Sequence, residues 1–111
     1  MPANDGNGVQ AVEKQFEIGH PTAAGHFPGN PIIPGAVLLD EVMQAVAART
    51  DGGIGPYEIR SAKFLRPVRP GDRILIRWRI RPDGEIKFEC LSMEPSALVL
   101  TGSVKLGGES P

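Results

Sequence analysis

The chain has 111 residues, which is the length of one small domain with a modest core. Its net charge is −1, with 12 basic and 13 acidic side chains, so the overall charge gives no reason to expect nucleic acid or an anionic membrane as a partner. No apolar run approaches the ~20 residues of a membrane span, and the first residues lack the features of a signal peptide. The single cysteine, Cys90, excludes an intrachain disulfide, so we expect a protein of the reducing cytoplasm.

The first half of the chain predicts a tail, a strand and a loop before any helix. Residues 1–10 are polar and rich in glycine, and we expect them to be disordered. Loose alternation of apolar and polar residues predicts a first strand over residues 12–19. One domain is expected over residues 11–106, followed by a short frayed tail over 107–111.

The rest of the chain predicts one helix followed by strands. The helix extends from Pro34 to about Arg49, since a proline suits the helix start and the Thr-Asp-Gly-Gly run breaks the pattern. Trp78 and three isoleucines alternate with a row of mainly arginines, which is the clearest strand pattern in the chain. An antiparallel sheet with one apolar face would wrap the helix, which is an α+β fold. Four strands are predicted, over residues 57–66, 72–81, 85–93 and 97–106.

The stretch from Gly25 to Gln44 joins a stiff loop to an apolar helix. Three prolines restrict the backbone of the loop, which can therefore hold the imidazole of His26 in one position. The helix is apolar at nearly every position, which is typical of a helix buried in a core. Asp40 and Gln44 lie four residues apart and share one face of it. Because a carboxyl group on a buried helix is costly, Asp40 is a candidate for a chemical role.

Residues 26–35, His-Phe-Pro-Gly-Asn-Pro-Ile-Ile-Pro-Gly, resemble a motif of the 3-hydroxyacyl-[acyl-carrier-protein] dehydratases, which are FabZ/FabA-like proteins. In that family an acid follows fourteen residues after the histidine and a glutamine four residues later, as Asp40 and Gln44 do after His26. Residues 64–72, Phe-Leu-Arg-Pro-Val-Arg-Pro-Gly-Asp, resemble the family's strand and turn after the helix. The resemblance implies the hot-dog fold, in which an antiparallel sheet wraps one long helix.

The resemblance also implies a reaction, in which a 3-hydroxyacyl thioester on acyl carrier protein loses water to give a trans-2-enoyl thioester. Such a reaction needs a base for the Cα proton, an acid for the leaving hydroxyl and a donor for the enolate oxygen. The resemblance assigns these roles to His26, Asp40 and the N–H of Gly35 respectively. Burial would raise the pKa of Asp40 and help it hold a proton. Gln44 is implied to support Asp40 and the carbonyl near Ile32 to orient the imidazole, with no metal or cofactor expected.

Asp40 departs from part of the family, in which many members have glutamate at this position. Aspartate also occurs there in the branch that isomerises 3-hydroxydecanoyl thioesters and in the small ApeI-like dehydratases of aryl-polyene-type lipid clusters. The run Pro-Gly-Ala-Val-Leu-Leu-Asp-Glu resembles the small branch. The short chain lacks the extra elements of the isomerising branch, which argues against isomerisation. The acyl chain length and the pathway, in fatty-acid or related lipid and polyene biosynthesis, stay open.

Three other functions stay open beside dehydration. A thioesterase of the same fold would use an acid on the helix but would need no histidine in this loop. A coenzyme A-linked hydratase would use the same chemistry on another thioester, and a non-catalytic acyl-binding subunit would need neither His26 nor Asp40. Glu41 is a rival for the acid role, although a solvated or interface position is the simpler interpretation. Cys90 has no histidine nearby in the sequence, so we do not expect a nucleophile.

Two kinds of partner are expected. A small sheet around one helix leaves apolar surface that a second copy could cover. The resemblance implies a homodimer, or a higher homo-oligomer, in which each site takes its histidine from one chain and its acid from the other; here these are His26 and Asp40. The second partner is an acidic acyl carrier protein, although a solvated sheet face is the simpler explanation of the basic residues. Its candidate docking residues are Arg66, Arg69, Arg77 and Arg79.

Overall fold

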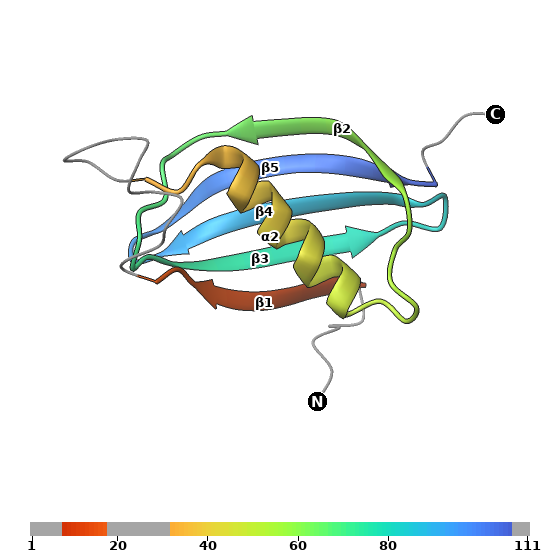
Figure 1. The fold of residues 1–111 in the computed structure, drawn as a ribbon, viewed down its shortest axis with the longest axis horizontal. Coiled ribbons are helices and arrows are strands. Elements are labelled where there is room, and N and C mark those ends of the chain that lie inside the picture. The colour runs from red at the N-terminus through yellow and green to blue at the C-terminus, as the bar shows by residue number, and fades with distance from the viewer. Residues whose placement is uncertain (1–7, 18–31, 108–111) are drawn as a thin grey trace.

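The computed structural model describes residues 8–17 and 32–107. One helix and five strands make up this part of the chain, so the α+β class is confirmed. None of its helices is long and apolar enough to cross a membrane. In chain order the elements are β1 (Val9–Gln15), α2 (Gly35–Ala48), β2 (Tyr57–Phe64), β3 (Arg73–Ile80), β4 (Glu85–Met93) and β5 (Ser96–Leu106) (Figure 1).

Strand β1 begins and ends earlier than the predicted range of residues 12–19. Its first two residues, Val9 and Gln10, pair with Arg79 and Trp78 of β3 and belong to the sheet. The tail expected over residues 1–10 is therefore too long at its carboxyl end. The limits of this edge strand depend on hydrogen bonds to β3, which lies about sixty to seventy residues away in the sequence, so local composition does not reveal them. Residues 1–7 and 108–111 lie outside the described part of the chain.

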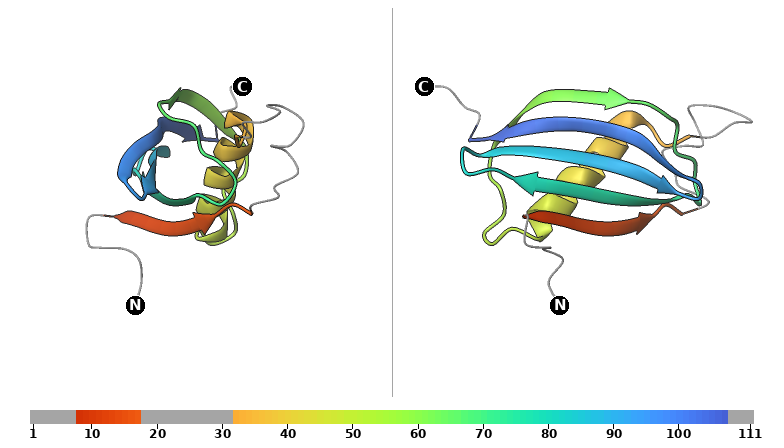
Figure 2. Two further views of the ribbon diagram at one scale, coloured as in Figure 1. Left: turned by 90° about the vertical axis from the view of Figure 1, so that its left-hand side faces the viewer. Right: turned by 180° about the vertical axis from the view of Figure 1, so that it is seen from behind.

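The strands form a single antiparallel sheet in the order β1-β3-β4-β5-β2. Strands β3, β4 and β5 are neighbours both in sequence and in the sheet. Strands β1 and β2 flank the helix in sequence but form the two opposite edges. The chain therefore crosses the width of the sheet through α2, and the sheet curls around the helix (Figures 1 and 2).

The core lies between the helix and the concave face of the sheet. Ile74, Ile76 and Trp78 of β3 are buried as their alternation predicted, and Phe88 of β4 lies directly across the sheet from Trp78. Burial of such side chains stabilises the fold by about 1.5–3 kcal/mol for each large apolar group. The buried cluster comprises Phe16, Ile33, Leu38, Val42, Met43, Val46, Val68, Ile74, Ile76, Trp78, Ile86, Phe88, Cys90, Val99, Leu100 and Val104.

Helix α2 begins directly after Pro34 and ends at Ala48, within one residue of the predicted limits. The N–H of Arg49 donates to the carbonyl of Val46 at 3.2 Å, and the hydroxyl of Thr50 donates to the same carbonyl at 2.8 Å. These bonds satisfy acceptors that the end of a helix would otherwise leave unpaired. The face that contacts the sheet, here called the inner face, contains the buried residues Leu38, Val42, Met43 and Val46.

The opposite side of α2 is not covered by the described residues. We call it the open face; its residues recur every four positions and are exposed. The expected burial of the whole helix is therefore wrong for the single chain. The sheet lies on one side of the helix only, and the apolar residues that suggested burial on the other side are small alanines. The open face contains Ala36, Asp40, Gln44 and Ala48.

Strand β2 forms one edge of the sheet and is exposed at all eight positions. Its pairing with β5 shifts register between Ile59 and Ser61. A Cβ atom at Gly102 of β5 would lie 2.3 Å from the carbonyl oxygen of Ser61 and 2.6 Å from the ring of Phe88. Only glycine therefore allows β2 to approach β5 this closely at the shift.

Candidate active site

The amino-terminal end of α2 is tied to the connection between β2 and β3. The N–H of Ile33 donates to the carbonyl of Val68 at 2.7 Å, which holds the chain just before the helix. A Cβ atom at Gly35 would lie 3.0 Å from two ring carbons of Phe64, so this ring packs directly over the glycine. Gly35 and Phe64 belong to two separate segments that the sequence analysis matched to the family, and only the fold shows that the two residues meet.

Gly35 supplies a hydrogen-bond donor at this end of the helix. It is the first residue of α2, and its N–H has no acceptor within residues 8–17 and 32–107. Val37 and Leu38, by contrast, both donate to the carbonyl of Pro34, at 3.0 and 3.1 Å. The positive end of the helix dipole adds to the effect of such a free donor. An oxygen that gains negative charge would be stabilised at this position.

Asp40 and Gln44 form a hydrogen-bonded pair on the open face. The side-chain Nε2 of Gln44 donates to Oδ2 of Asp40 at 2.5 Å. The five-residue separation from Gly35 places Asp40 about 7.5 Å along the helix axis from the N–H of Gly35. The structure thus brings an acid, its amide partner and a backbone donor onto one rigid element.

Asp40 is exposed in the single chain, which corrects the expectation that the helix buries it. The described residues place no apolar wall around its carboxyl group. The burial that the sequence analysis expected for Asp40 is therefore not provided by one chain alone. A second surface over the open face would be needed to bury Asp40.

Glu41, the rival acid, has a different environment. Its carboxylate forms an ion pair with Lys14 of β1 at 3.4 Å, and its side chain is 21% exposed. This contact ties α2 to the edge of the sheet. Glu41 is thus held toward β1 while Asp40 points from the open face, which favours Asp40 as the acid available to a substrate.

His26 lies outside the described residues, so its position relative to Gly35 and Asp40 stays a prediction. The same holds for the expected contact between its imidazole and the carbonyl near Ile32. Within residues 8–17 and 32–107, no group of three histidine, cysteine, aspartate or glutamate side chains is arranged to hold a metal ion.

Cys90 is part of the core and not of the site. It is fully buried on β4, and burial raises the pKa of its thiol from 9.0 to about 12. The thiol is therefore protonated at neutral pH and cannot serve as a nucleophile. This agrees with the interpretation from sequence.

The four arginines proposed to dock a carrier protein do not form one surface. Arg66 and Arg69 line a hollow of about 490 Å³ beside the connection between β2 and β3. Arg77 and Arg79 line a second hollow of about 920 Å³ on the face of the sheet that points away from the helix. Only Arg66 and Arg69 lie close to Gly35. They are sequence neighbours of Phe64, whose ring packs over Gly35, and of Val68, whose carbonyl accepts a hydrogen bond from the N–H of Ile33.

Comparison with known proteins identifies the family. Residues 4–102 match the family described as "ApeI-like: ApeI dehydratase". The chain belongs to the ApeI-like dehydratases. It is also similar to 3-hydroxyacyl-[acyl-carrier-protein] dehydratases named FabZ. That of Agrobacterium fabrum is 35% identical over 109 residues, which cover 90% of this chain and 71% of the relative. That of Rhizobium johnstonii is 34% identical over 109 residues, with 90% and 70% covered.

Solved structures show that this ApeI-like protein has the expected hot-dog fold. "The Dehydratase Heterocomplex ApeI:P from Xenorhabdus doucetiae" has a TM-score of 0.74 at 22% identity, with 88% of this chain and 86% of that chain covered. An (R)-hydratase from A. caviae has a TM-score of 0.62 at 21% identity, with 88% and 93% covered. An acyl-CoA hydrolase from Staphylococcus aureus also superposes, with a TM-score of 0.60 at 15% identity and 89% and 63% covered. The fold alone therefore does not separate dehydration from thioester hydrolysis.

Proposed function

We propose that this protein dehydrates 3-hydroxyacyl groups carried by acyl carrier protein and releases trans-2-enoyl thioesters. The observation that carries the proposal is the arrangement on α2. Asp40, held by Gln44, lies on the same helix as the N–H of Gly35, which has no acceptor in the described part of the chain. Asp40 and Gly35 include no base. The motif and its spacing to Asp40 support His26 in that role.

Each residue has one role in the proposed reaction. The imidazole of His26 removes a proton from Cα of the substrate, since its ordinary pKa lies close to neutrality. The electrons form the enolate, whose oxygen accepts a hydrogen bond from the N–H of Gly35. Asp40 then gives a proton to the hydroxyl at Cβ. The enolate re-forms the carbonyl, its electrons form the Cα=Cβ double bond, the Cβ–O bond breaks and water leaves. Gln44 keeps the carboxyl of Asp40 in one orientation through the bond it donates.

The reaction requires a cover over the open face, and we propose that a second copy of the chain provides it. In the single chain Asp40 is in contact with solvent. A covering surface would exclude water and favour a protonated carboxyl group. The alanines beside Asp40 allow another backbone to approach closely. In this dimer we expect His26 of one copy to meet Asp40 of the other.

We further propose that an acidic carrier protein docks at Arg66 and Arg69. Both line the hollow beside the connection from β2 to β3, close to the start of α2. Charge reversal at either residue should raise KM for a carrier-bound substrate several-fold at low salt. It should leave turnover of a small thioester unchanged. Charge reversal at Arg60, an exposed arginine that lines neither hollow, is the matched control.

The direct test offers the purified protein a series of 3-hydroxyacyl groups on acyl carrier protein and on coenzyme A, with mass spectrometry of the products. Loss of one water from the carrier-bound substrate is the expected result. Preference for coenzyme A would identify a hydratase instead. Cleavage of the thioester without loss of water would identify a thioesterase. Binding of the substrate without either reaction would identify a non-catalytic acyl-binding subunit.

A further inference from the structure

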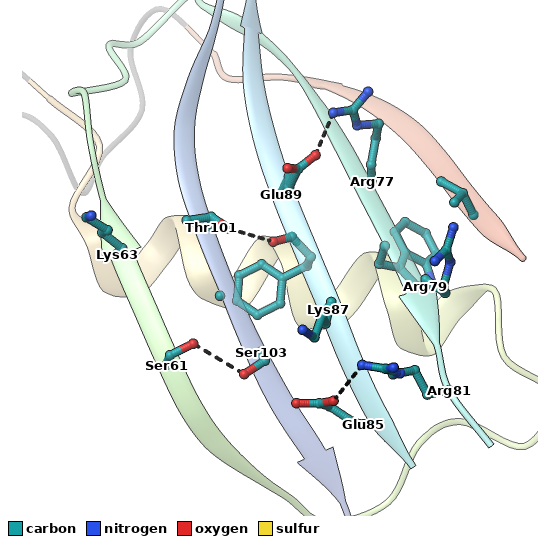
Figure 3. A pocket seen from close by; sticks show the side chains of 14 residues that line it. Ser61, Lys63, Arg77, Arg79, Arg81, Glu85, Lys87, Glu89, Thr101 and Ser103 are labelled. Atoms are coloured by element: carbon teal, nitrogen blue, oxygen red, sulfur yellow. Dashed lines mark hydrogen bonds and ion pairs between the residues drawn. The ribbon is translucent and has the colours of Figure 1, made fainter. Parts of the chain in front are cut away.

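The face of the sheet that points away from the helix has an electrostatic pattern that the proposed reaction does not use. Residues from all five strands line a hollow of about 920 Å³ there (Figure 3). We call it the outer hollow. Its lining includes five cationic side chains and two carboxylates, a local excess of three positive charges in a chain of net charge −1. The charged members are Lys63, Arg77, Arg79, Arg81, Glu85, Lys87 and Glu89.

Two of the arginines are each paired with a glutamate. Arg77 forms an ion pair with Glu89 on the neighbouring strand at 2.5 Å, and Arg81 forms one with Glu85 at 3.3 Å (Figure 3). The first pair joins β3 to β4, and the second joins the residue after β3 to the start of β4, so the two pairs lie on either side of Arg79. They neutralise the two carboxylates and hold the arginines in place.

The position between these two pairs is occupied by like charges. Arg79 lies directly opposite Lys87 in the pairing of β3 with β4. Both side chains are exposed, and within residues 8–17 and 32–107 neither makes a hydrogen bond or an ion pair. Like charges directly opposite each other destabilise a sheet. A glutamate at position 87 would have repeated the pattern of the two neighbouring pairs.

The same row continues across the sheet with hydroxyl donors. Lys87 lies opposite Ser103 of β5, and Ser103 lies opposite Ser61 of β2. The two serine hydroxyls are 3.2 Å apart and hydrogen-bonded to each other (Figure 3). One row across four strands thus presents two cations and two hydroxyl groups and contains no carboxylate.

We propose that the outer hollow binds an acidic segment of a partner protein. A carboxylate of that segment lies between Arg79 and Lys87, as Glu89 and Glu85 lie beside Arg77 and Arg81. Charge complementarity selects this occupant. A local excess of only three positive charges suits a short acidic segment and gives little attraction for a nucleic acid or an anionic membrane, whose binding depends on many cations. The surface lies on the side of the sheet away from Asp40, so the proposal does not depend on the proposed reaction.

The test measures binding of a fluorescent peptide of about twelve residues that alternates glutamate and serine, by anisotropy at about 0.02 M and 0.2 M salt. The full chain is compared with its Arg79→Glu and Lys87→Glu variants. Each reversal replaces one attraction by a repulsion and should weaken binding about five- to tenfold at low salt. The control variant Arg60→Glu alters an exposed arginine on β2 that does not line the hollow, and it should change affinity less than about twofold.

Measuring Tm shows whether a variant binds less because its site has changed or because it has unfolded. Lys87→Glu supplies the missing carboxylate opposite Arg79, so it should raise Tm by about 1–5 °C while it weakens binding. A lower Tm, or unchanged peptide affinity in both variants, would overturn the proposal. Tripolyphosphate and phosphatidylserine vesicles are the competing probes. If either binds more tightly than the peptide and responds to the same substitutions, the occupant is a phosphate group and the proposal fails.

Discussion

The two faces of helix α2 differ in side-chain size and in polarity. The inner face packs long or branched side chains against the sheet, and it accounts for much of the contact between the layers. The open face has alanines around one hydrogen-bonded pair, Asp40 and Gln44. Small side chains contribute little to a core but let another surface approach. The comparison teaches that the large apolar side chains of this helix pack against its own sheet, whereas its small ones leave a face that a second surface could approach.

The largest expected effect is on the open face. We predict that Asp40→Asn lowers the rate of dehydration about 10²–10⁴-fold, because the leaving hydroxyl loses its proton donor, and leaves Tm unchanged. His26→Ala should have an effect of similar size. Steady-state kinetics and thermal unfolding provide the two measurements. Glu41→Gln is the control, since Glu41 is paired with Lys14. If Glu41→Gln is the more damaging change, the acid has been assigned wrongly.

The second prediction tests what covers the open face. When inactive His26→Ala and Asp40→Ala proteins are mixed and exchange subunits, about half of the dimers are mixed. In each mixed dimer one site has both defects and the other has both residues intact, so roughly a quarter of wild-type activity should return.

Native mass spectrometry verifies that mixed dimers have formed, and co-expression replaces mixing if exchange is slow. Mixed dimers without recovered activity would contradict a site shared between copies. Activity that appears only with a different hot-dog protein would indicate a heterocomplex.

On the inner face we expect a loss of stability without a loss of chemistry. Leu38→Ala removes a side chain that is 3% exposed and should lower the free energy of unfolding by about 2–5 kcal/mol. Urea denaturation measures this change, and activity per folded molecule should stay close to wild type. Ala48→Ser on the open face should change stability by less than about 0.5 kcal/mol. Equal effects at the two positions would remove the distinction between the faces.

Cys90 gives a pH test of the core that the inner face contacts. The folded thiol has a pKa of about 12 and an ordinary thiol 9.0, so between these values the unfolded chain binds fewer protons than the folded one. Stability from this group is therefore complete below pH 9 and falls above it, by up to about 1.4 kcal/mol per pH unit. Comparing urea denaturation of wild type and Cys90→Ala from pH 8 to 11 isolates this slope. Identical slopes would show that the thiol is not buried as described.

The smallest expected effect concerns Gln44. We predict that Gln44→Ala lowers the dehydration rate about two- to tenfold, because the carboxyl of Asp40 loses the bond that orients it, without a change in Tm. Gln44→Asn, whose side chain is one methylene shorter, should not restore the rate. If Gln44→Ala keeps the wild-type rate, the hydrogen bond from Gln44 to Asp40 has no role in the reaction.

Local features of the sequence determined the elements and the family. Pro34 and the glycines after Arg49 set the limits of α2 within one residue, and alternation in β3 predicted its buried face. The motif and its spacing to Asp40 predicted the family. These features act over a few residues or over one turn of helix, so a single sequence contains them. The position of His26 in the site remains a prediction.

Only the tertiary structure decided which residues meet. It placed β1 and β2 at opposite edges of the sheet, set Phe64 over Gly35 and paired Glu41 with Lys14. It also left Asp40 on an open face and separated the arginines into two hollows. Each of these outcomes depends on contacts between segments distant in sequence. Local propensity does not encode such contacts, because they form only when the sheet closes around one side of the helix.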